Sequence, residues 1–158
     1  MVFQRDIAVF QKIVWAFYKK NGRFSLPWRK TKDAYKILVS ELMLQQTQVS
    51  RVAPKYAAFL KVFPSIQTLA SAPLADVLRA WQGLGYNRRA KFLHVLAKEV
   101  VKNYKGKLPS SENELLQLPG VGPATASAIM AFAFDKPTVY LETNVRSVFL
   151  HHFFADAD

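Results

Sequence analysis

The residues with the clearest chemical potential lie in one apolar stretch, Ser40 to Val49, with the sequence SELMLQQTQV. It holds one carboxylate, Glu41, and three glutamines that follow it, Gln45, Gln46 and Gln48. A carboxylate among leucines is costly while charged, so burial would raise its pKa and make it a proton donor. At about 100° per helical residue, Glu41, Gln45 and Gln48 fall within roughly a 60° arc. The glutamines would then read or wedge a ligand beside the acid. In the alternative interpretation, Glu41 is a solvated helix glutamate.

A second carboxylate, Glu142, also lies among apolar neighbours beside a structural transition. Cleavage of a glycosidic-type bond requires two carboxylates on different elements. One protonates the leaving group, and the other, ionised, stabilises the oxocarbenium ion or positions water. The alternative is that Glu142 only precedes a helix cap made by Thr143 or Asn144 and is stabilised by the helix dipole.

The charge balance points to a polyanionic partner. The 158 residues include 22 Lys+Arg and 11 Asp+Glu, a formal net charge of +11. Such a surplus indicates nucleic acid or an anionic membrane surface as partner. The alternative is a basic soluble protein without such a partner. No apolar run has the length of a membrane span, and lysines interrupt the N-terminal segment, so we expect no signal peptide and a cytoplasmic, nucleoid-associated location.

Metal and thiol chemistry are not expected. The chain has no cysteine, which removes disulfides, thiol catalysis and cysteine-bound zinc or iron–sulfur clusters within it. Its three histidines, His94, His151 and His152, make a poor metal signature. We therefore expect no metal site and no cofactor held by these residues.

Helical periodicity of apolar residues runs through the whole chain, and no segment alternates convincingly as a strand does. The predicted fold class is therefore all-α. Helices are expected over residues 4–21, 33–46, 50–63, 66–70, 73–81, 87–104, 111–118, 124–134 and 145–154.

One loop is typical of a phosphate-binding element. Residues 118–122 read LPGVG, and Pro123 suits the first position of the next helix. Residues 111–134 are therefore expected to form a helix, a Gly-x-Gly hairpin and a second helix. The second helix would present unpaired backbone N–H groups at its N-terminus. Such a site binds a phosphate without reading its base. Ser111 and Glu114 are expected to form a capping box before it.

Two other loops combine aromatic and basic residues. In the segment 22–33, Trp28 is expected to pin the loop to the core, while Arg29 is a candidate contact to nucleic acid. The segment 83–86, GLGY, breaks the helical pattern, and Arg88 and Arg89 then begin a long basic helix. This segment is not a dinucleotide fingerprint, because no strand precedes it and its glycine spacing differs from that motif.

Residues 118–129, LPGVGPATASAI, resemble the helix–hairpin–helix of the HhH-GPD superfamily of base-excision DNA glycosylases, which includes endonuclease III. Within that superfamily, four further segments resemble the MutY-type adenine DNA glycosylases: 26–29 (LPWR), 40–49, 83–86 and 144–146 (NVR). The likeness extends from about Trp15 to Val148. It implies a six-helix barrel over about 28–137 and a second helical domain, built from 1–27 and 138–158, that is incomplete.

The resemblance also implies a mechanism in which the target nucleotide is flipped out of the duplex. Glu41 matches the family's general acid, which protonates adenine N7. Glu142 stands where the family has an aspartate that stabilises the positive sugar, and Asn144 matches the asparagine that supports this carboxylate. Gln45 matches a residue that wedges into the base stack, and Tyr86 matches one that intercalates beside the orphan base.

At the hairpin, the resemblance implies that the amides from Gly120 to Ala124 grip a phosphate, often with an alkali cation. Ala124 stands where bifunctional relatives carry a Schiff-base lysine, so a monofunctional enzyme is expected. The residues expected to contact DNA are Arg29, Gln45, Gln46, Gln48, Tyr86, Arg88, Arg89, Gly120, Val121, Gly122, Ala124 and Thr125.

Two departures from the family pattern stand out. Glu142 is one methylene longer than the family's aspartate, which displaces its charge, and small displacements are costly in catalysis. The family's four-cysteine cluster segment and its C-terminal domain for 8-oxoguanine would both lie beyond Asp158. A fragment, a shortened chain or a reduced homologue is therefore expected.

The predicted function is that of a monomeric DNA glycosylase in base-excision repair. It would release a mispaired adenine opposite 8-oxoguanine or G from double-stranded DNA. One alternative is the same fold acting on mismatched T or U. The others are a non-catalytic DNA-binding module and, prompted only by the net charge, a peripheral membrane binder.

Overall fold

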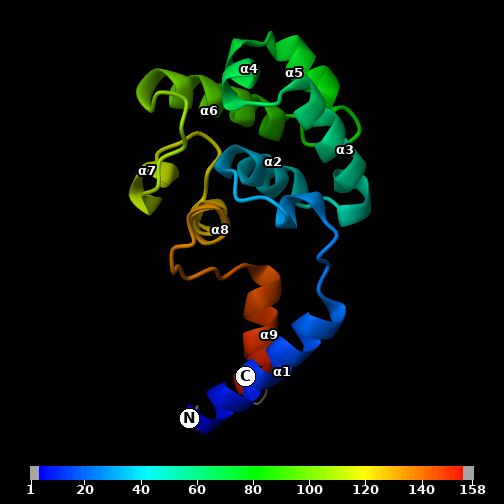
Figure 1. The fold of residues 1–158 in the computed structure, drawn as a ribbon, viewed down its shortest axis with the longest axis vertical. Helices are drawn as coiled ribbons and strands as arrows, with labels where there is room; N and C mark the ends of the chain where they lie inside the picture. Colours follow the sequence, from blue (N-terminus) through cyan, green and yellow to red (C-terminus); the bar gives the residue numbers. More distant parts are fainter. Residues whose placement is uncertain (1–3, 155–158) are drawn as a thin grey trace. The chain divides into compact units, whose positions relative to one another are not determined.

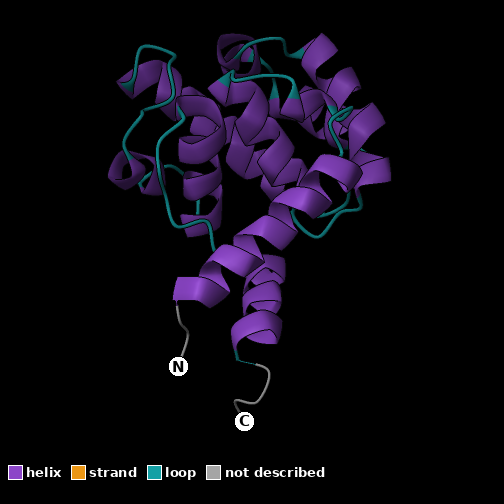
Figure 2. Ribbon diagram, turned by 60° about the horizontal axis from the view of Figure 1, so that its bottom comes forward, coloured by secondary structure: helices purple, strands orange, loops and turns teal. Residues whose placement is uncertain are grey.

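The computed structural model describes the backbone of residues 4–154 and the side chains of residues 6–154 (Figure 1). Every regular element in the described part is a helix (Figure 2), which confirms the all-α prediction. The chain divides into two compact units, residues 26–140 and residues 1–25 with 141–158. Each unit is described by itself.

The larger unit is built around α2 (Ala34–Leu44), which packs against α3, α6 and α8 (Figure 1). Seven of the 11 residues of α2 are buried, so it is apolar on nearly all sides, as expected for a core helix. The Asp33 carboxylate begins it by accepting hydrogen bonds from the amides of Tyr35 and Lys36. The other elements of this unit are η1 (Pro27–Arg29), α3 (Val49–Val62), α4 (Ile66–Ser71), α5 (Leu74–Trp81), α6 (Arg88–Asn103), α7 (Glu112–Leu116) and α8 (Pro123–Phe134).

Aromatic side chains fill much of the core of this unit. Phe59 and Trp81 are fully buried and meet edge to face, with ring centroids 5.8 Å apart. Trp28 lies in η1, a short helix inside the segment expected to be loop, and packs edge-on against Tyr56 at 5.4 Å. The predicted role of Trp28, pinning its segment to the core, is confirmed.

The end of α2 differs from the prediction. The helix ends at Leu44, and the next two residues leave the helical conformation: Gln45 has ψ 115° and Gln46 has φ +52°. Gln48 is the N-cap of α3. The prediction that Glu41, Gln45 and Gln48 share one helix face is therefore wrong, because the three residues do not lie on one helix.

Ser65 forms a complete capping box with Thr68 at α4. The capping box predicted for Ser111 and Glu114 is wrong, because the Ser111 side chain makes no capping hydrogen bond at α7. Pro123 does occupy the start of α8, as predicted.

The smaller unit pairs α1 (Gln4–Asn21) with α9 (Thr143–Phe153). Phe10 of α1 contacts the rings of Phe149, His152 and Phe153, at centroid distances of 5.0–5.3 Å. No described helix, here or in the larger unit, is long and apolar enough to cross a membrane.

Candidate functional site

Glu41 lies in the last two turns of α2, between the fully buried Ser40 and Leu42. Burial of its carboxyl raises the pKa from the ordinary value of 4.5 to about 7. Within residues 6–154, no hydrogen bond or ion pair reaches this carboxylate. The group is therefore partly protonated near neutral pH, as a general acid must be. These features favour the proton-donor interpretation over that of a solvated glutamate.

The raised pKa has a consequence for stability. Because the folded-state pKa lies above the unfolded one, the stabilising effect is complete below about pH 4.5 and is lost as the pH rises through 7. We expect Glu41→Gln, which carries no charge, to unfold with a free energy higher than the parent's by about 3 kcal/mol at pH 8. The difference should shrink steadily towards pH 4.5. Urea unfolding at four pH values, with the exposed Glu114→Gln as control, measures it; a difference independent of pH would contradict the shift.

The glutamines lie on the segment that joins α2 to α3, beyond the end of the helix that carries Glu41. Gln45 Nε2 donates a hydrogen bond to Thr125 Oγ1 at 3.4 Å, which joins this segment to the first turn of α8. Gln45, Gln46 and Gln48 are exposed. The structure therefore brings Gln45 to the hairpin, although it does not place the glutamines on the helix of Glu41.

The hairpin between α7 and α8 divides its residues between the core and the surface. Gly120, Gly122 and Ala124 are exposed, whereas Val121 and Thr125 are buried, so their side chains face inward. No side chain caps the start of α8, whose N-cap is Gly122. The first amides of a helix have no partner within it, and uncapped they form an anion site. The side chains of Val121 and Thr125 do not contribute to that surface, and only their backbone could.

The segment 83–86 has a constrained backbone. Gly83 and Gly85 have positive φ, and Tyr86 follows at φ +47° with 62% of its surface exposed. Arg51, at the start of α3, donates from Nη2 to the carbonyl oxygen of Gly83 at 2.8 Å. Arg51 was not identified from the sequence as a residue that fixes this segment. Its only signal there is that a basic residue follows the glutamines closely.

The two arginines after Tyr86 behave differently. Arg88 is exposed and lies 5.0 Å from the ring centre of Phe92. Arg89 is only 8% exposed, and its guanidinium donates to backbone carbonyls of the segments around residues 42–45 and 84–85. Arg89 therefore has a structural role, because its guanidinium donates inside the protein, and its contact with DNA stays a prediction. Arg29, in η1, is exposed.

In the smaller unit, Glu142 is itself the N-cap of α9. Its Oε1 accepts a hydrogen bond from the Val145 amide at 3.0 Å, and its Oε2 accepts one from Asn144 Nδ2 at 3.1 Å. The cap expected from Thr143 or Asn144 is thus made by the glutamate instead. The contact between Asn144 and this carboxylate is the one that the resemblance implies, and a catalytic role for the pair stays a prediction.

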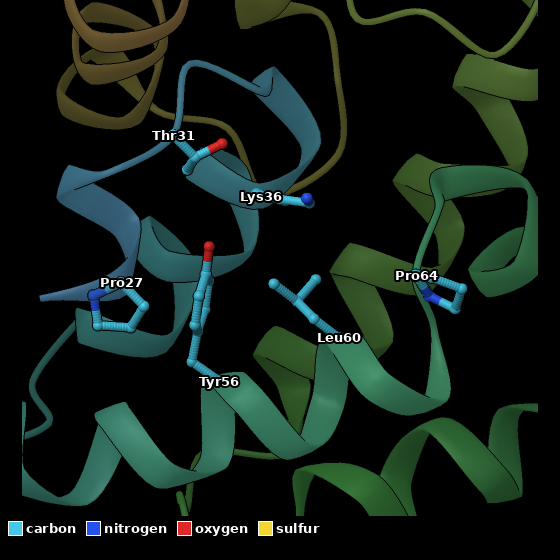
Figure 3. Close-up of a pocket in the computed structure, with 6 residues that line it drawn as sticks. All are labelled: Pro27, Thr31, Lys36, Tyr56, Leu60 and Pro64. Atoms are coloured by element: carbon cyan, nitrogen blue, oxygen red, sulfur yellow. The ribbon is translucent and has the colours of Figure 1, made fainter.

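Two pockets of the larger unit are lined by other residues. One is lined by Pro27, Thr31, Lys36, Tyr56, Leu60 and Pro64 (Figure 3), and the other lies between the start of α2 and the Gly106 turn. Among the described residues, no group of three or more His, Cys, Asp and Glu side chains could hold a metal ion.

Comparison with known proteins identifies the family of this chain. The model of the HhH-GPD superfamily base excision DNA repair proteins matches residues 39–158. The adenine DNA glycosylase of Buchnera aphidicola subsp. Baizongia pistaciae is 41% identical over 145 residues, which are 92% of this chain and 41% of that protein. The adenine DNA glycosylase of Mycolicibacterium smegmatis is 46% identical over 129 residues, 81% of this chain and 44% of that protein. The chain thus spans about two fifths of the length of these relatives.

Solved structures show the same fold. A thermostable thymine-DNA glycosylase superposes with a TM-score of 0.85 at 30% identity, over 92% of this chain and 67% of that one. Endonuclease III in a non-covalent DNA complex superposes with a TM-score of 0.82 at 20% identity, over 94% and 68% of the two chains. The residues of the hairpin, the family match and the shared fold together show that this chain belongs to the HhH-GPD superfamily of base excision DNA repair proteins.

Proposed function

We propose that this chain is the catalytic portion of a monofunctional adenine DNA glycosylase of base excision repair. It would hydrolyse the N-glycosidic bond of a mispaired adenine flipped out of double-stranded DNA. The observation that carries the proposal is Glu41, a half-buried acid with a pKa of about 7 on the core helix of a chain 41–46% identical to two adenine DNA glycosylases.

The raised pKa of Glu41 suits the first step. Its carboxyl transfers a proton to N7 of adenine, so the base can leave as a neutral molecule. The bond between N9 and the sugar C1′ then breaks with its electron pair on the base. Water adds to C1′ and loses a proton to solvent, leaving an abasic site and free adenine. General acid catalysis of this kind contributes about 10²- to 10⁴-fold in rate.

The second carboxylate of the reaction is proposed to be Glu142, by its position in the family pattern. Its hydrogen bonds with Asn144 and the Val145 amide restrict its side chain to one orientation. An ionised carboxylate there would stabilise the positive charge that develops on the sugar.

DNA would be held through its backbone by the uncapped start of α8 and by the surplus of basic residues. The exposed Gln45 and Tyr86 would then probe the base pair, as the resemblance implies. We infer that the chain binds as a monomer to DNA in the cytoplasm.

The function is tested by single-turnover base release, detected as strand scission after alkali treatment. The duplexes carry A opposite 8-oxoguanine, A opposite G, T opposite G and U opposite G. Scission of the two adenine duplexes supports the proposal. Scission only at T or U would establish the second candidate, mismatched-pyrimidine release, which the likeness to a thymine-DNA glycosylase favours. Binding without scission of any duplex would indicate a non-catalytic DNA-binding module.

A further inference from the structure

Arg89 joins two segments that are distant in sequence. Its Nη1 donates to the carbonyl oxygens of Leu42 at 2.8 Å and Met43 at 3.1 Å, and also to that of Gln45. Its Nη2 donates to Thr47 Oγ1 at 3.1 Å and, more weakly, to the carbonyls of Leu84 and Gly85, both at 3.3 Å. One guanidinium thus connects residues 42–47 to residues 84–85.

The same group also holds the ring of Tyr86. The Arg89 guanidinium carbon lies 5.1 Å from the centre of that ring and 5.7 Å from the centre of the Trp81 ring. Trp81 Nε1 in turn donates to the Gly85 carbonyl at 3.2 Å. Tyr86 therefore contacts the guanidinium while most of its surface remains exposed.

Both segments contain a residue in a conformation that side chains rarely adopt. Gln46 has φ +52° and Tyr86 has φ +47°, and neither is glycine. Arg89 contacts the residues on both sides of Gln46 and the carbonyl that precedes Tyr86. Unfavourable backbone conformations persist where their surroundings over-determine them, and they cluster at functional sites.

The burial of the Arg89 guanidinium is not explained by a gain in folding stability. No carboxylate in the described part of the chain pairs with Arg89, and its Nε is buried with no hydrogen-bond partner there. A buried charge that only neutral carbonyl and hydroxyl groups and aromatic rings compensate is often less stabilising than an apolar side chain of similar size. The contacts of Arg89, however, require several N–H donors held in one plane, and among side chains only a guanidinium supplies them.

We propose that Arg89 is a positioning residue that sets the segments 45–47 and 83–86 in one register, so that Gln45 and Tyr86 engage a mispaired duplex together. The inference deepens the proposed function and rests on it where DNA is concerned. Arg89 itself contacts no DNA; it acts through the Gln45 backbone and the Tyr86 ring.

The register is tested first in the free protein, by hydrogen exchange of backbone amides in Arg89→Lys. Lysine keeps the charge but cannot reach both segments with its single ammonium. We expect exchange to rise by about tenfold in 45–48 and in 83–86 together. Exchange in 105–107, a turn that Arg89 does not touch, should stay unchanged. The control is Arg79→Lys, at an exposed arginine that pairs with Asp76. A rise in one segment alone, or throughout the protein, would overturn the proposal.

The second test measures affinity for a duplex with A opposite 8-oxoguanine, relative to a fully paired duplex of the same length. Arg89→Lys should lower this ratio by about tenfold, and Tyr86→Ala should lower it by a similar factor. The double variant should lose little more than either single variant, because both changes remove the same engagement. Equal loss on both duplexes, or fully additive losses, would show a merely structural arginine.

Two further outcomes are distinguished: a variant that does not fold, and a failure of the proposed function itself. If Arg89→Lys does not fold, Thr47→Val, which removes one acceptor of the guanidinium, should raise exchange in 83–86 as well as in 45–48. A rise in 45–48 alone would reflect only the lost hydrogen bond from Thr47 to the Gln45 carbonyl and would overturn the proposal. If the parent releases no base and prefers no mismatch, the proposed function is wrong, while the exchange experiment still decides whether Arg89 sets the register.

Discussion

Replacement of Glu41 by glutamine is expected to lower the single-turnover rate of adenine release by about 10²- to 10⁴-fold. The amide has nearly the shape of the acid but has no proton to give to N7. Affinity for the mismatched duplex should change little, since Glu41 makes no hydrogen bond or ion pair within the described residues and its removal disturbs no contact network. The measurements are alkali-revealed strand scission with enzyme in excess, and fluorescence anisotropy of labelled duplex.

The pH profile adds a second criterion to this experiment. The parent's rate should decline as the pH rises through about 7, where Glu41 loses its proton, and the residual rate of the variant should not follow that decline. Glu114→Gln, at an exposed position on α7, is the matched control and should behave as the parent does. Full activity in Glu41→Gln would exclude the general-acid role.

Replacement of Gly122 by aspartate is expected to separate folding from DNA binding. Gly122 is the N-cap of α8 with φ −97° and ψ 177°, an extended conformation that aspartate adopts readily at this position. Nothing lies within 4 Å of a Cβ added there. The new carboxylate would cap the free amides, so stability should be kept or slightly raised. DNA affinity should fall by about 10- to 100-fold, because the carboxylate takes the place of the phosphate and repels it.

The contrast with Gly120 makes this test specific. Gly120 has φ +79°, and a Cβ added there would lie 2.8 Å from Cβ of Phe92. Gly120→Ala should therefore lower the free energy of unfolding by about 1–3 kcal/mol. Thermal melts and salt-dependent anisotropy of both variants provide the comparison. Unchanged DNA affinity in Gly122→Asp would show that the hairpin does not hold a phosphate.

Much of the fold could be predicted because its causes are local. The helical class follows from apolar periodicity, and the capping box of Ser65 and the proline at the start of α8 depend on residues a few positions away. The hairpin was predictable for the same reason, since glycines at 120 and 122 and a proline at 123 restrict the backbone directly. Glu41 was notable in the sequence because a single acid interrupts an apolar run.

Tertiary contacts decided the remaining features. Arg89 looked like a surface cation at the start of a basic helix, but its acceptors lie up to 47 residues earlier in the chain, and no local pattern records them. The end of α2 could not be predicted either, because the guanidinium takes carbonyls at that end and the chain turns away at Gln45.

The sequence by itself therefore determined the helices, the hairpin and the presence of an acid in an apolar stretch. Only the tertiary structure decided the protonation of that acid, since the raised pKa of Glu41 comes from burial. It likewise decided which arginine is available to a ligand and which one is used within the protein. Burial and long-range hydrogen bonds depend on residues that meet only after the chain has folded.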